Sequence, residues 1–325
     1  MNNELLNNLY GLQKNPFAPE FGEELFPSNC EDLTLLYAKV EGFGRQVSFI
    51  DNWFTKPGNL AKSNCILICG FDGSGRTSVV NYIIWRFCEA KKINLKQITL
   101  IETIVKNEHD IEPIQDLLKE LCTYLNKLLG KKFTEEYGDL KKDYREQVLY
   151  NKAPGTQRAY NYIFSESKPI LNSQDIIPIV KIENINNYQQ VHIASEVFSS
   201  ADVIIYTTTS SEVYQQFIQE HSKGNIDGFS VSLTKLNLQD VINFICWRWE
   251  KCCEDNKEHP FDEDGLKLVF ENPMPFKGVV KIITEAFNNH IEIVNSKSDF
   301  HCNSESLIIS RDRIIKAAMD YFNPR

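Results

Sequence analysis

The chain has 325 residues, of which 42% are hydrophobic and 24% charged, and its formal net charge is −9 at pH 7. This length suits one large or two medium domains, and the apolar content excludes a chain that is disordered throughout. The acidic balance disfavours nucleic acid or an anionic membrane as the main partner, although it allows a local basic patch. No apolar run approaches the ~20 residues of a membrane span, and the start of the chain lacks the basic and apolar regions of a signal peptide.

The cysteines and histidines show no pattern of a metal or disulfide site. The nine cysteines are scattered, contain no C-x-x-C pair and in several cases fall within apolar runs. Such thiols are typical of a reducing compartment, so we expect a cytoplasmic protein. The histidines are dispersed without metal-ligand spacing, and no order of Ser, His and Asp or of Cys and His indicates covalent catalysis.

Residues 1–40 form an N-terminal arm rich in Asn, Pro and Phe, and we expect it to pack along the surface of the domain C-terminal to it. Short amphipathic helices are expected at 33–39 and 46–54, joined through residues 41–45. Pro57-Gly58-Asn59 is a normal stop for the second of these helices.

A glycine-rich segment comes after the first strongly apolar run. Residues 63–69 (SNCILIC) predict a buried strand, residues 70–77 read GFDGSGRT, and residues 78–90 have the apolar spacing of a helix. A strand, a glycine-rich loop and a helix in this order are the context of the phosphate-binding pattern G-x-x-x-x-G-K-[ST]. The backbone N–H groups of such a loop form an anion-binding nest at a helix N-terminus. The candidate phosphate-binding residues are Gly70, Asp72, Gly73, Ser74, Gly75, Arg76, Thr77 and Ser78.

One position of this pattern departs from the rule. Arg76 stands where lysine reaches the β- and γ-phosphates, while Thr77 stands where a hydroxyl binds Mg²⁺. Arginine keeps the charge but is longer, planar and forked, so its fit to the loop is not guaranteed. The alternative interpretation is a glycine-rich turn that binds nothing.

The rest of the chain predicts an α/β domain and then a run of helices. Strands are expected near 65–69, 97–101, 176–182, 202–207 and 229–232, alternating with helical segments, which indicates a parallel sheet covered on both faces. Residues 112–130 predict a helix that ends at Gly130, and the charged stretch 131–168 predicts a solvated, piecewise helical segment. Pro178 is unusual in a central strand because it cannot donate to the ladder. Helices are expected at 238–253, 262–270, 278–291 and 311–322.

Polar residues stand at the ends of two of these strands. Glu183 is an acid where a metal-associated carboxylate is expected, and Asn184 stands in the place of the acid that activates water, although an amide cannot accept a proton. Thr208 belongs to a run of hydroxyls at the carboxyl end of the fourth strand, where ligands gather in open parallel sheets. The alternatives are an ordinary turn after Glu183 and a helix N-cap after Thr208.

These features, in this order, resemble the AAA+ ATPases. The branch they resemble is the origin-recognition-like, transposition-regulator and signal-transduction (STAND) group. Residues 42–47 (GFGRQV) look like the entry segment that lies against the adenine, which makes Arg45 a candidate nucleotide contact. Residues 70–77 look like Walker A, 179–184 like a degraded Walker B and 206–210 like sensor 1, and Lys277 is the nearest match to the sensor 2 arginine. The resemblance covers roughly residues 40–322.

The resemblance implies a P-loop NTPase with a five-stranded parallel sheet in AAA+ order and a small all-helical lid. It implies an N-terminal arm (1–40), an α/β nucleotide-binding domain (41–234) and a helical lid domain (235–325). Two strand orders are compatible with it, 5-1-4-3-2 and 5-4-1-3-2, and we take the second as the order of the family. It also implies ATP or ADP with Mg²⁺ as cofactors, with Thr77 and Glu183 at the metal.

The departures from the family pattern point to lost or very slow hydrolysis. They are Arg76, the pair Glu183-Asn184, lysine at sensor 2 and the absence of an arginine between sensor 1 and the fifth strand. We therefore expect a regulatory or structural subunit of a homo- or hetero-oligomeric cytosolic assembly, such as one of bacterial defence, transposition or signalling. An active ATPase and a nucleotide-free scaffold remain as alternatives.

Overall fold

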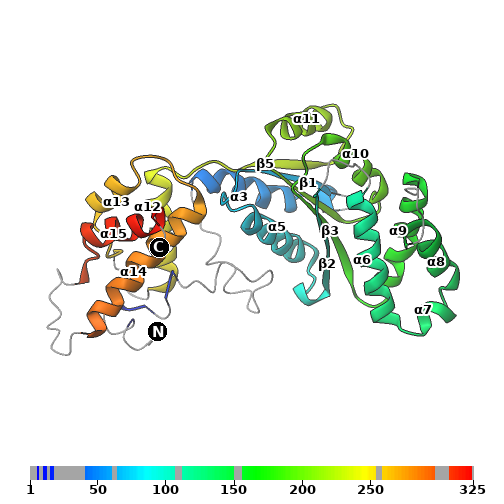
Figure 1. Ribbon diagram of the computed structural model, residues 1–325, viewed down its shortest axis with the longest axis horizontal. Coiled ribbons are helices and arrows are strands. Elements are labelled where there is room, and N and C mark those ends of the chain that lie inside the picture. Colours follow the sequence, from blue (N-terminus) through cyan, green and yellow to red (C-terminus); the bar gives the residue numbers. More distant parts are fainter. Residues whose placement is uncertain are drawn as a thin grey trace. The chain divides into compact units, whose positions relative to one another are not determined.

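The computed structural model describes residues 6, 10–12, 15–17, 41–60, 64–106, 112–149, 156–253, 258–296 and 307–323, with backbone only for 41–47 and 251. The chain divides into two compact units (Figure 1). The helical unit comprises Met1–Asp51, Asp72–Tyr82 and Leu233–Arg325, and the sheet unit comprises Asn52–Phe71 and Ile83–Ser232. The domain limits expected from the sequence at 41 and 235 remain predictions.

The sheet unit contains the predicted five-stranded parallel sheet, and the chain is therefore an α/β protein with a C-terminal helical region. The strands are β1 (Asn64–Cys69), β2 (Ile98–Ile104), β3 (Ile177–Glu183), β4 (Val203–Thr208) and β5 (Gly228–Ser232). Their order is β2-β3-β4-β1-β5, and every pair is parallel. This is the first of the two expected orders. The second, 5-4-1-3-2, is wrong, because β5 pairs with β1 and β4 lies between β1 and β3.

The burial of the strands explains their sequences. All six residues of β1 and all six of β4 are buried, as expected for central strands of a sheet covered on both faces. Pro178 is the second residue of β3, whereas the pairing of β3 with β4 begins at Val180. The missing N–H of Pro178 therefore falls before the ladder with β4, which explains how a central strand tolerates proline.

The sheet unit contains the helix expected at 112–130 as α6, but Pro57-Gly58-Asn59, expected to stop a helix, lies within the short helix α4. The helices of this unit are α4 (Pro57–Leu60), α6 (Glu112–Leu129), α7 (Lys132–Glu135), α8 (Gly138–Asp143), α9 (Gln157–Asn172), α10 (Tyr188–Val197) and α11 (Ser211–Ser222), with a 3-10 turn at Leu95–Gln97 and a π-helical turn at Tyr144–Leu149. The described residues of the segment 131–168 are helical in pieces, as predicted. They are not only a solvated face, however, because Phe133, Tyr144 and Phe164 are fully buried in the core that α6, α9 and α10 share with the sheet.

The helical unit contains α12 (Leu238–Cys252), α13 (Glu263–Val269), α14 (Phe276–Ser296) and α15 (Arg311–Phe322). The N-terminal arm was expected along the surface of the domain that follows it, but four of its described residues are buried in the helical unit. Leu6, Tyr10, Leu12 and Phe17 are at most 4% exposed. Aromatic side chains need apolar neighbours, and α12 and α14 supply them to Tyr10 and Phe17, so these described residues of the arm are part of the helical core.

Two further helices, α3 (Glu41–Phe54) and α5 (Arg76–Lys91), contribute residues to both units. The helix expected at 46–54 begins five residues earlier, so residues 41–45 are helical rather than a joint. Glycine costs about 1 kcal/mol in a helix interior, and at Gly42 and Gly44 this cost does not end the helix. Residues 33–39 lie outside the described residues.

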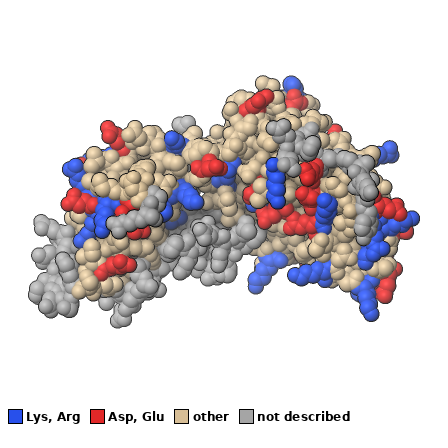
Figure 2. All heavy atoms as spheres, viewed as in Figure 1, with Lys and Arg blue, Asp and Glu red and all other residues tan. Residues whose placement is uncertain are grey.

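Within the described part of the chain, no helix is both long enough and apolar enough to cross a membrane. On the described surface that Figure 2 shows, each unit carries acidic as well as basic side chains.

Candidate nucleotide-binding site

The predicted phosphate-binding loop begins directly after β1. The Gly70 N–H donates to the Thr208 carbonyl oxygen of β4 at 3.0 Å, and α5 begins six residues later at Arg76. Gly73 and Gly75 have φ angles of +79° and +95°, in the region that favours glycine. The loop therefore turns through two conformations that its glycines permit before it enters the helix.

Two buried polar atoms of the loop have no partner among the residues that the structure describes. They are the hydroxyl oxygen of Ser74, a residue that is 1% exposed, and Nη1 of Arg76. Buried polar groups in folded proteins are nearly always hydrogen-bonded. Both atoms can donate, and both belong to the segment that enters α5, where the first N–H groups of a helix have no partner within it, so an oxyanion is the chemical complement of this loop.

Arg76 is held inside its own loop. Its Nη2 atom lies 2.8 Å from Oδ1 of Asp72, and the Arg76 side chain is only 16% exposed whereas that of Asp72 is 93% exposed. The positive charge of Arg76 therefore stays beside the loop, but one nitrogen of its guanidinium group is already paired with the Asp72 carboxylate. Thr77, the expected metal ligand, is exposed on the first turn of α5.

The helical unit also brings Lys277 to this loop. The Lys277 N–H donates to the Gly73 carbonyl oxygen at 2.9 Å, at the start of α14. A Cβ atom on Gly73 would lie 3.3 Å from Cβ of Lys277, so the two backbones approach closely. The nearest match to a sensor 2 residue is thus in contact with the loop through its backbone, and its side chain is exposed.

In the sheet unit, β3 ends at Glu183 and the backbone then turns sharply. Asn184 is exposed and has a φ angle of +59°, a conformation that asparagine tolerates better than most residues. Its N–H donates to Oγ1 of Thr207 at 3.2 Å, and the Ile185 N–H donates to the Thr207 carbonyl oxygen at 2.8 Å. The turn at the end of β3 is therefore tied to the end of β4.

Thr208 is fully buried, and its hydroxyl is already used by the protein. It donates to the Ile185 carbonyl oxygen at 2.5 Å and accepts from the Ser210 N–H at 2.9 Å. Ser210 in turn caps α11 by accepting from the Val213 N–H. The turn and cap interpretation weighed from the sequence therefore accounts for these hydroxyls, and a sensing role for Thr208 stays a prediction.

Sequence reasoning missed Lys181. Its Nζ lies 2.5 Å from Oε1 of Glu183 and 2.9 Å from Oε2 of Glu102, and its side chain is 3% exposed. Burial lowers the pKa of Lys181, but the hydrogen bonds and charges of the two glutamates outweigh it and leave the pKa above its usual value. Side chains two residues apart in a strand lie on the same face, so the sequence alone could have indicated that Lys181 and Glu183 are neighbours.

These residues do not fit a Mg²⁺ site at Glu183. The carboxylate expected to hold the metal is already paired with a buried ammonium group, and Asn184 beside it is exposed. Within the described ranges, no group of three or more His, Cys, Asp or Glu side chains could hold a metal ion. For Arg45, only the backbone within α3 is described, and its expected adenine contact stays a prediction.

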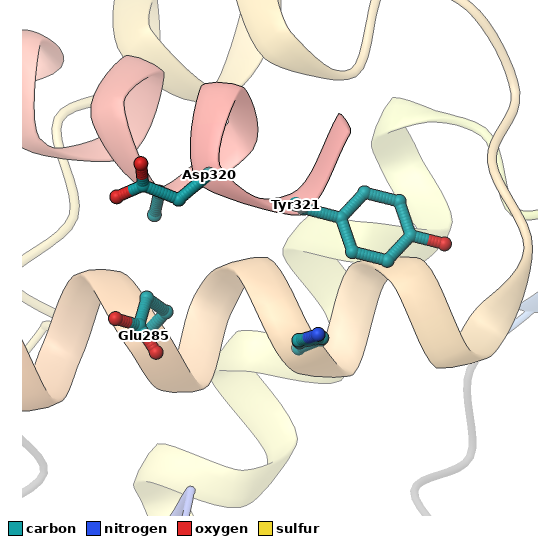
Figure 3. Close-up of a pocket in the computed structure, with 5 residues that line it drawn as sticks. Glu285, Asp320 and Tyr321 are labelled. Atoms are coloured by element: carbon teal, nitrogen blue, oxygen red, sulfur yellow. The ribbon is translucent and has the colours of Figure 1, made fainter. Parts of the chain in front are cut away.

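A separate hollow of about 190 Å³ lies between α14 and α15 (Figure 3). Glu285 of α14 and Asp320 of α15 line it together with Lys281, Ala317 and Tyr321. Two carboxylates disfavour a phosphate ligand there, so the loop at 70–78 remains the candidate site.

No protein-family model matches the sequence, and no curated protein matches it. Solved structures with a similar fold include the ORC2 protein of Aeropyrum pernix in ADPNP–ADP complexes (TM-score 0.49, 12% identity, 86% of this chain and 67% of that one) and Cdc6p from Pyrobaculum aerophilum (TM-score 0.49, 10% identity, 93% and 69%). Domain III of the replication initiation protein DnaA from Thermotoga maritima is a third (TM-score 0.38, 13% identity, 92% and 99%). Likenesses at this level say nothing about the ligand or the partner of this chain.

Proposed function

We propose that the chain is an AAA+-like nucleotide-binding protein that takes ATP or ADP at residues 70–78 and hydrolyses ATP slowly or not at all. The observation that carries this proposal is the pair of buried donors at Ser74 and Arg76, unpartnered among the described residues, in a loop that ends at the start of α5. In this role the N–H groups of residues 73–78 and the Ser74 hydroxyl hold phosphate oxygens. Arg76 and Lys277 supply positive charge, which compensates for the phosphates.

Slow hydrolysis is expected from what the chain offers for the chemical step. Asn184 cannot accept a proton from water, because an amide has no basic lone pair at neutral pH. The segment from residue 209 to residue 227 contains no arginine that could act on the nucleotide of a neighbouring subunit. In related phosphoryl transfers an arginine of this kind contributes about 10³–10⁵ in rate.

The biological role we propose is that of a regulatory or structural subunit in a cytoplasmic homo- or hetero-oligomer. Bacterial defence, transposition or signalling assemblies are the settings that the family resemblance suggests. Nucleic acid is a conceivable partner, but the net charge of −9 does not indicate one.

The binding experiment compares the melting temperature of the purified chain with and without ATP or ADP, for the wild type and for Gly75→Val. We expect nucleotide to stabilise the wild type by mass action and to leave the variant unchanged, since valine is strained at a φ angle of +95° and blocks phosphate from the backbone. An equal shift in both proteins would exclude this loop as the site. No shift in the wild type would favour the nucleotide-free scaffold.

The chemical experiment is phosphate release from ATP, with Thr77→Ala as the control. We expect turnover far below the ~1–10³ s⁻¹ typical of enzymes, with no difference between the two proteins. Robust turnover that disappears in Thr77→Ala would establish the alternative, an active ATPase.

A further inference from the structure

We propose that strand β2 is an interaction surface for a second copy of this chain, whose own β2 adds to the sheet in the antiparallel direction. The surface lies wholly within the sheet unit and does not involve the nucleotide. The inference goes beyond the proposed function by naming one interface and one partner for the oligomer.

The first step is that β2 forms an edge of the sheet. In the described sheet, whose order is β2-β3-β4-β1-β5, β2 pairs with β3 alone. The Val105 N–H, directly after β2, donates to the Glu183 carbonyl oxygen at 2.9 Å, so the N–H groups of even-numbered residues of β2 face away from β3. Ile101 is buried, but the other residues of β2 are half-buried or exposed. Such an edge is a template for another strand.

The second step is the sequence of β2, which is nearly symmetric about Ile101. Residues 98–104 read ITLIETI, so an antiparallel copy centred on Ile101 places isoleucine opposite isoleucine and threonine opposite threonine. Leu100 then lies opposite Glu102. Because both of these positions are even-numbered, their outward N–H and C=O groups face each other, and each residue can donate to and accept from the other. The strand is therefore complementary to itself.

The third step is the charge of this surface. The register centred on Ile101 places each Glu102 opposite an apolar side chain and not directly opposite its own copy, where like charges would destabilise the pair. The Lys181 ammonium group lies 2.9 Å from Oε2 of Glu102 and compensates its charge. The carboxylates of the two copies therefore oppose the pairing only weakly.

The fourth step is a side chain that competes for the same surface. Oε2 of Glu120, an exposed residue of α6, accepts a hydrogen bond from the Glu102 N–H at 3.2 Å. This N–H is one of the outward donors that the second copy needs. Charged side chains commonly protect the edges of sheets, so we expect Glu120 to limit the strength of the pairing.

The experiment is sedimentation equilibrium of the full-length chain without nucleotide, over a range of protein concentrations. We expect the wild type to dimerise with a dissociation constant on the order of 100 μM, since two paired strands bury less surface than a standard interface. Glu120→Ala frees the Glu102 N–H and should tighten the dimer by about tenfold. Asp116→Ala, which removes another exposed carboxylate of α6, is the control and should leave the dissociation constant unchanged.

Opposite charges at position 100 test the register. In Leu100→Lys the new ammonium group lies opposite Glu102 of the second copy, so we expect the dimer to tighten by about threefold, and by less at high salt. In Leu100→Glu two carboxylates lie opposite each other, and we expect the dimer to weaken by about tenfold. Both variants lose the same leucine, so the difference between them reports the charge.

Two results would overturn the inference. One is that the wild type and Glu120→Ala both stay monomeric up to about 300 μM. The other is a dimer that responds neither to Glu120→Ala nor to the sign of the charge at position 100, because it would use another surface. If Glu120→Ala does not fold, the two variants at position 100 decide the question. ADP binding is tested separately by the melting experiment, so the nucleotide site and this surface can fail independently.

Discussion

At the scale of one residue, Arg76 keeps the positive charge of the lysine expected at its position, but part of its guanidinium group is not available to a ligand. Its guanidinium contacts Asp72 through Nη2, and its Nη1 atom is buried without a partner in the described part of the chain. A bound phosphate would satisfy the second nitrogen, but it would also lie near the Asp72 carboxylate. The loop therefore contains both an attraction and a repulsion for phosphate, four residues apart.

Removing that repulsion is the first prediction. In Asp72→Asn the local negative charge is lost and Arg76 is released toward the ligand, so we expect ADP affinity to rise by about two- to fivefold at low salt and less at high salt. Titration calorimetry at two salt concentrations measures both effects. Asp116→Asn, which removes the carboxylate of another exposed ion pair, is the control and should leave affinity unchanged. Weaker binding in Asp72→Asn would mean that the carboxylate helps to position Arg76.

Gly73 offers a second test at this scale, with a closely matched control. Gly73 and Gly224 have φ angles of +79° and +77°, but a Cβ atom on Gly73 would meet Lys277 at 3.3 Å whereas one on Gly224 would meet nothing within 4 Å. Alanine at either position should cost roughly 1–2 kcal/mol of folding free energy through backbone strain. Only Gly73→Ala should also weaken ADP binding, by about threefold or more, because it disturbs the contact between the loop and Lys277. Equal effects on binding would show that strain alone explains them.

At the scale of elements, the turn after β3 is held by the end of β4. Thr208 makes two hydrogen bonds, to Ile185 and Ser210, from a fully buried position. Thr208→Val keeps the shape but leaves a carbonyl and an N–H unpaired, so we expect a loss of about 1–3 kcal/mol in the free energy of unfolding. Urea unfolding measures this loss. Ser74→Ala, which removes a buried hydroxyl that has no partner among the described residues, should leave stability nearly unchanged and weaken ADP binding instead. The reverse pattern would contradict both assignments.

The same elements show what could be predicted from the sequence. The central strands β1 and β4 contain the apolar runs Cys65–Cys69 and Val203–Tyr206, so their existence and parallel direction could be inferred from composition and from the helices between them. The strand order could not, because the short β5 sequence does not specify which neighbour it pairs with. The ion pairs of Lys181 were also missed, since one of its two partners, Glu102, is 79 residues away and comes into register only when the sheet forms. Motifs formed by consecutive residues could be predicted from the sequence, whereas contacts between distant segments could not.

At the scale of the whole molecule, the described apolar residues of the N-terminal arm belong to the core of the helical unit. The Phe17 ring is 1% exposed and makes edge contacts with Phe261 and Phe287 at centroid distances of 5.6 Å and 5.4 Å. The Tyr10 hydroxyl shares a hydrogen bond of 2.6 Å with Nε2 of the buried His290. The sequence showed that the arm is rich in aromatic residues. It did not show that their partners lie more than 200 residues later.

This arrangement leads to the last prediction. Phe17→Ala removes a fully buried ring from the helical core, and such changes cost about 3–5 kcal/mol because a cavity is left behind. The loss should fall on the helical unit, so amide hydrogen exchange should accelerate in α12–α15 while strands β1, β3 and β4 keep their protection. Phe322→Ala is the matched control in the same unit, because its side chain is 61% exposed and its removal should change stability by less than about 0.5 kcal/mol. If Phe17→Ala accelerated exchange no more than Phe322→Ala does, the arm would be an attachment to the helical unit and not part of its core.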